Sequence, residues 1–221
     1  MHKFVSLWNL KPEVAIEAAE RQYYGVHVPM ACRIPGVRRY TVARSRGRSP
    51  RFFRIAELYF DDKDACKAGL GSDQGKRVLG DPEFQATLSE VVPFFAEEQV
   101  VIPGAGLRSQ RPVKIVNLWT WKDDVNPDEA DRYYVERHVP LAFTNPGLAR
   151  YHTSRAVGKR PAFARIAELY FEDMETCKAC LRSPEMAKVL DDKPFWSKVK
   201  EHFAVFFEEE TVSLHEGRVL A

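Results

Sequence analysis

Apolar and polar residues alternate in four short stretches of the first 101 residues, and this period of two predicts β-strands. The stretches are Phe4–Leu10, Val37–Arg44, Phe53–Phe60 and Phe94–Val101. Between them, apolar residues recur at helical spacing. One helix is predicted within Glu13–Arg33, broken near Val28-Pro29, and a second in two parts, Ala65–Leu70 and Phe84–Val91. The predicted order is β-α-β-β-α-β, which is that of a ferredoxin-like unit.

The whole pattern occurs twice in the chain. Arg54–Phe60 reads RIAELYF, and the same seven residues return 111 positions later as Arg165–Phe171. The same offset matches, without a gap, Trp8 to Trp119, His27 to His138, and Tyr40 to Tyr151. The repeat predicts two tandem domains, residues 1–101 and 113–213, with a linker at 102–112 and a loose tail at 214–221.

A four-stranded sheet with helices on one face leaves its other face to be covered. We expect the two sheets to pack face to face, as an intramolecular, pseudo-dimeric α+β barrel with a lined interior. Side chains two positions apart on a strand share a face of the sheet. If Val5, Leu7, Ala56, Leu58 and Phe60 face the helices, the residues that alternate with them face the barrel interior. The expected barrel-facing residues are Ser6, Trp8, Tyr40, Arg44, Glu57 and Tyr59, with Asn117, Trp119, Tyr151, Arg155, Glu168 and Tyr170 in the second half.

Composition narrows the range of partners. The net charge of +2 is too close to zero to favour nucleic acid or an anionic membrane. No stretch resembles a signal peptide or a membrane span, so a cytoplasmic location is expected. Of the four cysteines only Cys66 and Cys177 correspond between the repeats, which argues against a disulfide framework. Cys177 and Cys180 lack a second pair of ligands, so no metal site is expected.

His27 and His138 end the first predicted helix of each repeat, both in the string His-Val-Pro. Histidine has an ordinary pKa near 6.5 and can give or take a proton at neutral pH. Beside a tyrosine that faces the barrel, each histidine is a candidate general acid or base. The sequence leaves a structural alternative equally open, in which each histidine caps its helix at the C-terminal end, where the dipole favours a cation.

Three motifs in each repeat carry a resemblance to a known family. They are Arg21-x-Tyr23-x-x-x-His27-Val28-Pro29, Pro35-Gly36-Val37-x-x-Tyr40 and Ala56-Glu57-Leu58-Tyr59-Phe60, with counterparts that begin at Arg132, Pro146 and Ala167. Over nearly the whole chain this pattern resembles the EthD family of the dimeric α+β barrel superfamily. The resemblance is specific for the fold and much less so for the activity.

Related barrels include methylmuconolactone methylisomerases, muconolactone isomerases and polyketide cyclases, which rearrange, cyclise or dehydrate small compounds without a cofactor. In the methylisomerases a histidine and a tyrosine serve the site. By motif, the resemblance therefore assigns catalysis to His27 with Tyr40 and to His138 with Tyr151. Chlorite dismutases and haem-degrading monooxygenases are relatives by fold, but the chain shows no strong haem motif.

Glu57 and Glu168 are carboxylates on a predicted wall of the barrel, where a buried charge must be paired or perturbed. The expected partners are the arginines nearby, Arg54 and Arg44 in the first half and Arg165 and Arg155 in the second. A structural ion pair is favoured over a catalytic role. A carboxylate with a raised pKa beside His27 would nevertheless form an acid/base pair.

The leading hypothesis is a cofactor-independent lyase or isomerase that acts on a small apolar or aromatic metabolite inside the barrel. Trp8, Glu57 and Tyr59, with Trp119, Glu168 and Tyr170, would contact this ligand. The alternatives are a non-catalytic binding or accessory protein and a haem-using oxidoreductase. The protein is expected to be a monomer or a homodimer. The two halves differ, for example at Leu10 and Trp121, so one pocket could work while the other is structural, and the sequence does not identify which.

Overall fold

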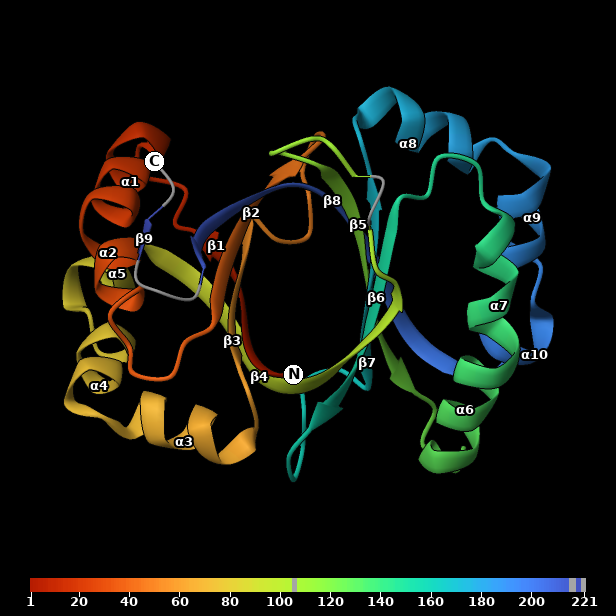
Figure 1. The fold of residues 1–221 in the computed structure, drawn as a ribbon, viewed down its shortest axis with the longest axis horizontal. Helices are drawn as coiled ribbons and strands as arrows, with labels where there is room; N and C mark the ends of the chain where they lie inside the picture. The colour runs from red at the N-terminus through yellow and green to blue at the C-terminus, as the bar shows by residue number, and fades with distance from the viewer. Residues whose placement is uncertain (105–106, 215–217, 220–221) are drawn as a thin grey trace.

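The predicted strands form one antiparallel sheet that closes on itself (Figure 1). The computed structural model describes residues 1–104, 107–214 and 218–219. Its strands are β1 (His2–Leu10), β2 (Arg39–Arg46), β3 (Arg54–Phe60), β4 (Leu88–Ile102), β5 (Val113–Trp121), β6 (Arg150–Val157), β7 (Arg165–Phe171), β8 (Val199–Leu214) and β9 (Arg218–Val219). The order is β2-β3-β1-β4-β6-β7-β5-β8, and β2 pairs back onto β8. The predicted pseudo-dimeric α+β barrel is therefore confirmed.

The fourth strand of each half is about twice as long as predicted because it pairs with both halves. β4 pairs with β1 of its own half and with β6 of the other, and β8 pairs likewise with β5 and β2. The helix predicted over Phe84–Val91 was wrong in its second part, since β4 begins at Leu88. Residues 105–106 of the predicted linker, and 215–217 and 220–221 of the predicted tail, lie outside the described residues.

The helices form two groups on opposite sides of the barrel, one for each half of the chain (Figure 1). The first group is α1 (Ile16–Gln22), η1 (Tyr23–His27), α2 (Val28–Ala31), α3 (Lys63–Gly71), α4 (Asp73–Leu79) and α5 (Pro82–Ala86). The second is α6 (Pro127–Tyr133), η2 (Tyr134–His138), α7 (Val139–Leu141), η3 (Ala142–Thr144), α8 (Met174–Leu181), α9 (Pro184–Leu190) and α10 (Lys193–Trp196). None of the described helices is long and apolar enough to cross a membrane.

The expected facing of β1 and β2 was wrong, whereas that of β3 was right. β1 pairs Val5 with Glu57 and Ser6 with Ala56, and directly paired residues share one face of a sheet. Val5 and Leu7 accordingly pack in the barrel interior, in a cluster that includes Val116 and Leu118 of the other half. The residues expected inside but found on the helix-facing side are Ser6, Trp8, Tyr40 and Arg44, with Asn117, Trp119, Tyr151 and Arg155.

The barrel interior contains an apolar cluster and a buried charged cluster. Glu57, Tyr59, Glu168 and Tyr170 face inward as predicted, but they pack against two lysines. Lys114 Nζ lies 2.6 Å from Glu57, 2.7 Å from Glu168 and 2.6 Å from Glu209. Lys3 Nζ lies 2.6 Å from Glu57 and 2.5 Å from Glu168. These residues form a buried ion network in the barrel interior.

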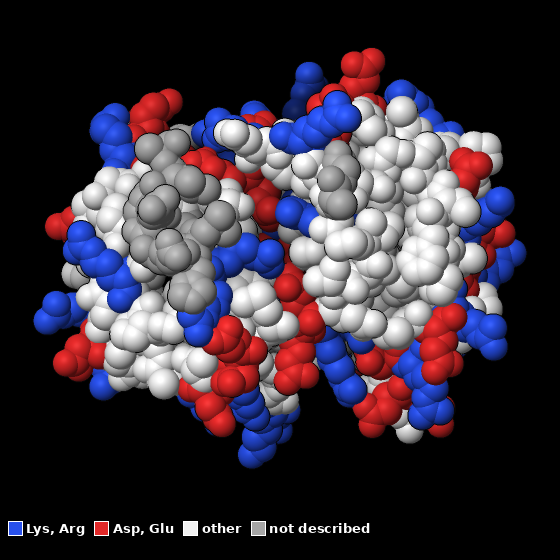
Figure 2. Space-filling view, viewed as in Figure 1, with Lys and Arg blue, Asp and Glu red and all other residues white. Residues whose placement is uncertain are grey.

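The arginines expected to pair with these glutamates have other partners. Arg54 binds Glu20, and Arg165 binds Asp131, both on the helix side of the sheet. Sequence proximity favoured Arg54, but successive strand residues point to opposite faces, so Arg54 cannot share a face with Glu57. On the face shown in Figure 2, charges of both signs lie over the first half and around the rim of the second half, whose centre is largely uncharged.

Candidate active site

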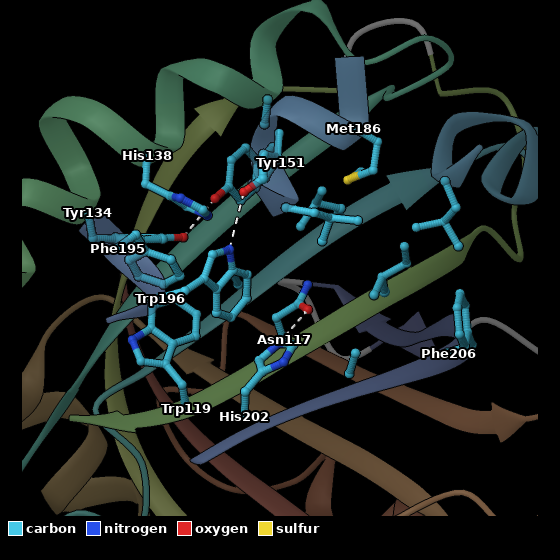
Figure 3. Close-up of a pocket in the computed structure, with 18 residues that line it drawn as sticks. Asn117, Trp119, Tyr134, His138, Tyr151, Met186, Phe195, Trp196, His202 and Phe206 are labelled. Atoms are coloured by element: carbon cyan, nitrogen blue, oxygen red, sulfur yellow. Dashed lines mark hydrogen bonds between the residues drawn. The ribbon is translucent and has the colours of Figure 1, made fainter. Parts of the chain in front are cut away.

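Each half of the molecule has an apolar pocket between the outer face of the sheet and its helices. The second-half pocket has a volume of about 150 Å³, and its lining includes Trp119, Tyr134, His138, Tyr151, Phe195 and His202 (Figure 3). The first-half pocket has a volume of about 350 Å³ and is lined by the counterparts Trp8, Tyr23, His27, Tyr40 and Phe84, among others. The predicted catalytic histidines and tyrosines therefore meet Trp8 or Trp119 in these two pockets, but the pockets lie under the helices and not within the barrel.

A π-helical turn delivers a tyrosine and a histidine to each pocket. In the first half the turn is Tyr23–His27, and in the second it is Tyr134–His138. The Val139 amide bonds the carbonyl of Tyr134, five residues earlier, which defines the wider turn. The following Pro140 has no amide to donate, so the helix cannot continue its regular hydrogen bonding there. The imidazole of His138 stacks on Tyr134, with ring centroids 5.6 Å apart.

Both histidines pair with a buried aspartate that the sequence analysis did not single out. His138 Nδ1 lies 2.8 Å from Asp192 Oδ2, and His27 Nδ1 lies 2.9 Å from Asp81 Oδ2. Each aspartate is the N-cap of the short helix that follows, since its other oxygen accepts the amide of Phe195 or Phe84. One carboxylate therefore begins a helix and fixes the orientation of an imidazole.

Burial holds both imidazoles in the neutral form. It lowers the pKa of His138 below the ordinary value of 6.5, and the hydrogen bond and negative charge of Asp192 offset only part of this effect. The same balance lowers the pKa of His27. Because Nδ1 faces a carboxylate, it carries the proton, and Nε2 keeps a lone pair. Within the described residues Nε2 of His138 makes no hydrogen bond, so it is available to a ligand.

The tyrosines of each pocket form a hydrogen-bonded pair. The hydroxyl oxygens of Tyr134 and Tyr151 are 2.7 Å apart, and those of Tyr23 and Tyr40 are 2.9 Å apart. Burial raises the pKa of all four phenols, so they stay protonated at neutral pH. In such a pair one hydroxyl donates to the other, which in the first half leaves the second proton free for a ligand oxygen. In the second half the Tyr151 proton is free when Tyr134 accepts a hydrogen bond from Thr153 and donates its own proton to Tyr151.

The tyrosine pair of the second half is anchored more firmly than that of the first. Thr153 Oγ1 lies 3.1 Å from the Tyr134 hydroxyl and accepts a hydrogen bond from Arg165 Nη1 at 3.0 Å. The counterpart of Thr153 in the first half is Val42, which has no polar side-chain atom. This difference gives the second-half pair a hydrogen-bonded route through Thr153 to the buried Arg165, whereas in the first half Arg54 contacts the face of the Tyr23 ring.

Three carboxylates of the barrel interior, Glu57, Glu168 and Glu209, lie close enough together to hold a cation. The ammonium of Lys114 already contacts all three of them. The negative charge is therefore balanced within the protein, and the donor set does not fit a metal ion.

Sequence reasoning missed Tyr23, Tyr134, Asp81 and Asp192 as members of the pockets. Tyr23 stood in the quoted family motif, four residues before His27, but was given no role. Asp81 and Asp192 are also matched by the 111-residue offset, and this was the available signal. Their 54-residue separation from the histidines is closed only by the folded chain.

Comparison with known proteins identifies relatives for each half. The EthD domain matches residues 11–96 and again residues 122–198. An uncharacterized 11.0 kDa protein of Rhodococcus erythropolis, from the thcB-thcC intergenic region, is 26% identical over 106 residues, which make up 47% of this chain and 100% of that protein.

Two solved structures extend the comparison. An anthrone oxidase-like protein is 11% identical with a TM-score of 0.71, and the match covers 100% of this chain and 96% of that one. An EthD-family protein of Bacillus halodurans is 28% identical with a TM-score of 0.39, covering 45% of this chain and 99% of that one. At 11% identity the first likeness concerns the fold alone.

Proposed function

The chain belongs to the EthD family, whose domain it carries twice, and on that premise we propose that it is a cofactor-independent lyase or isomerase for a small aromatic metabolite. The observation that carries the proposal is the buried aspartate–histidine pair, which recurs in both halves beside a tyrosine pair. A neutral histidine whose second nitrogen is fixed by a carboxylate is arranged as a general base. The apolar walls around it strengthen every charge interaction formed with a ligand.

In the proposed reaction His138 Nε2 removes a proton from a ligand carbon next to a carbonyl. The electron pair of the broken C–H bond moves onto the carbonyl oxygen, which becomes an enolate. A hydroxyl of the Tyr134–Tyr151 pair donates a hydrogen bond to that oxygen, and Asp192 stabilises the imidazolium. The imidazolium then returns the proton to a different carbon, which is an isomerisation, or to a leaving group, which is an elimination. His27, Asp81 and the Tyr23–Tyr40 pair have the same arrangement in the first half.

Hydrogen–deuterium exchange tests the proposal without knowledge of the natural substrate. Acetophenone is a single-ring ketone with an exchangeable methyl group, and a cavity near 150 Å³ can hold one benzene ring. In D₂O near neutral pH we expect the protein to accelerate the loss of the methyl signal in proton NMR. The double variant His27→Gln/His138→Gln should exchange the methyl protons about 100-fold more slowly, because a positioned general base accelerates proton transfer roughly 10²–10⁴-fold.

His2→Gln is the matched control, because His2 is buried on β1 but lines neither of these pockets. It should exchange acetophenone at the wild-type rate. Exchange by the double variant at the wild-type rate, or by the wild type at the rate of buffer alone, would show that the histidines are not the base.

A non-catalytic carrier is the second candidate, favoured by the largely apolar lining of both pockets. The same experiment separates the two functions, because a carrier binds acetophenone without accelerating its exchange. A haem-using oxidoreductase, the third interpretation, requires a Soret band in the purified protein or after addition of haem.

A further inference from the structure

The two pockets share their histidine, aspartate and tyrosines, but they differ at three other lining positions. In the second half these positions are Asn117, Trp196 and His202. The residues 111 positions earlier are Ser6, Gln85 and Val91. The first-half pocket thus has one histidine and the second-half pocket has two. Figure 3 shows His138, Tyr134 and Tyr151 on one side of the second-half pocket and the Asn117–His202 pair on the other.

The second histidine is held by contacts that the first half cannot make. His202 Nε2 lies 3.0 Å from Asn117 Oδ1. The Trp196 indole packs edge-on against both histidines, with ring centroids 5.0 Å from His202 and 5.9 Å from His138. His202 lies on β8, lines the pocket and is exposed to solvent. Its ring is therefore oriented by neighbours yet remains accessible to a ligand and to water.

The hydrogen bond to Asn117 defines what His202 can offer. An amide oxygen only accepts, so Nε2 of His202 donates to it, and Nδ1 is the nitrogen left for a ligand. Partial burial, followed by the nearby His138, lowers the pKa of His202 below 6.5. At neutral pH Nδ1 is then an acceptor for a ligand hydroxyl.

From these contacts we propose that the second-half pocket binds a single-ring aromatic ligand with a hydrogen-bonding group at each end, and that His202 contacts the outer group. The inner group is a carbonyl that accepts a hydrogen bond from the Tyr134–Tyr151 pair beside His138. The outer group, a hydroxyl, donates to His202 Nδ1. The first-half pocket has valine at the His202 position and recognises the inner group alone. This assignment rests on the proposed function for the identity of the inner end.

The volume of the second-half pocket supports the ligand class. About 150 Å³ accommodates a benzene ring with few additional atoms, whereas about 350 Å³ in the first half leaves more room. A small pocket with polar groups at both ends selects strongly, because a ligand that lacks one group leaves a protein atom unpaired. The two halves of the chain would therefore differ in specificity although their bases are alike.

Binding of two probe ketones tests the proposal. 4-Hydroxyacetophenone differs from acetophenone only by a hydroxyl opposite the ketone. The ring-proton NMR signals of His138 and His27, assigned through their glutamine variants, report binding at each pocket separately. We expect 4-hydroxyacetophenone to bind the His138 pocket about tenfold more tightly than acetophenone does, and the His27 pocket with little change.

The repeat supplies matched variants. Asn117→Ser/His202→Val places the first-half residues in the second pocket and should abolish the tenfold gain, while acetophenone affinity stays within about twofold. Ser6→Asn/Val91→His should keep the gain at His138 and add one at His27. A gain that persists in Asn117→Ser/His202→Val, an equal gain at both wild-type pockets, or no gain at either would overturn the proposal.

The acetophenone exchange assay tests the proposed function separately from the ligand class that the binding experiment tests. A tenfold gain without accelerated exchange of acetophenone would leave the ligand class standing and remove the proton-transfer chemistry. Accelerated exchange of acetophenone without the tenfold gain would support the proton-transfer chemistry and remove the proposed ligand class.

Discussion

At the scale of single residues, the pocket histidines show how one carboxylate can serve both folding and chemistry. Asp192 accepts the Phe195 amide at the start of α10 and holds His138 Nδ1 at 2.8 Å. Without this partner, the buried imidazole could rotate or change tautomer. The sequence-based alternative of a histidine that caps its own helix does not describe this arrangement, because here the aspartate caps a different helix and the histidine is its side-chain partner.

Replacing Asp192 with asparagine separates the two tasks. Asparagine is also a good N-cap, so α10 should persist. Loss of the negative charge should lower the pKa of His138 further below 6.5. NMR titration of the His138 ring protons measures this shift, and the lower limb of the pH profile for acetophenone exchange should move to lower pH with it. Exchange requires neutral histidine, so the rate should rise with pH and level off by about pH 7.

Asp81→Asn is the matched control, because it faces His27 in the other half. It should lower the pKa of His27 and leave that of His138 unchanged. An unchanged His138 pKa in Asp192→Asn would mean that the carboxylate does not act electrostatically on the ring.

At the scale of elements, the two long strands decide how the halves are joined. β4 and β8 each run from their own sheet into the other one, so the halves share a continuous hydrogen-bonded ring. The outer part of β8 pairs Thr41 with Thr211 and Val42 with Glu210. A strand edge left without such a partner is open to association with other chains.

Truncation at two points of β8 tests this closure. Ending the chain after Phe207 removes the pairing with Arg39–Arg44 of β2, the buried Val212 and Glu209 of the ion network, and should lower Tm by about 10 °C or more. We also expect concentration-dependent association in light scattering, because β2 becomes an edge. Ending the chain after Leu214 keeps these pairs and should leave Tm unchanged. The mass measured by light scattering should then fall only by the mass of the residues removed. Equal behaviour of the two truncations would contradict this role of β8.

At the scale of the whole molecule, a buried charged cluster links the halves across the pseudo-twofold axis. Lys3 of the first half binds Glu168 of the second, and Lys114 of the second binds Glu57 of the first. Burial alone would raise the pKa of Glu168, but Lys114 and Lys3 hold it well below the ordinary value. Burial alone would lower the pKa of Lys114, but Glu168, Glu209 and Glu57 raise it. Glu168 and Lys114 therefore stay charged, and each depends on its partners in the cluster.

Removal of one lysine should expose that dependence. Lys114→Met removes the one ammonium that contacts all three carboxylates, although Lys3 still contacts Glu57 and Glu168, and it should lower the free energy of unfolding by about 3–5 kcal/mol, measured in urea. Lys200→Met removes an exposed lysine that pairs with Asp123 at 2.9 Å and should unfold at the wild-type urea concentration. Equal midpoints for Lys114→Met and the wild type would refute the proposed role of the cluster.

The sequence predicted the facing of β3 correctly and that of β1 and β2 incorrectly, for a physical reason. In most antiparallel sheets one face is buried and the other is wet, so alternation identifies the core. Here both faces are buried, one by helices and one by the opposite sheet. Val5 and Trp8 are both fully buried residues on opposite faces of β1, so apolar character alone could not tell which faced the helices.

The sequence by itself determined the duplication, the order of the strands and helices, the closed barrel and the family. The first three follow from local alternation and from a 111-residue offset that persists without gaps, and the family follows from the three motifs of each repeat. Only the tertiary structure decided that the pockets lie under the helices, that Asp81 and Asp192 orient the histidines, and that His202 distinguishes the halves. These features depend on contacts between residues 54 or more positions apart, and the register of strand pairing fixes which of them share a face.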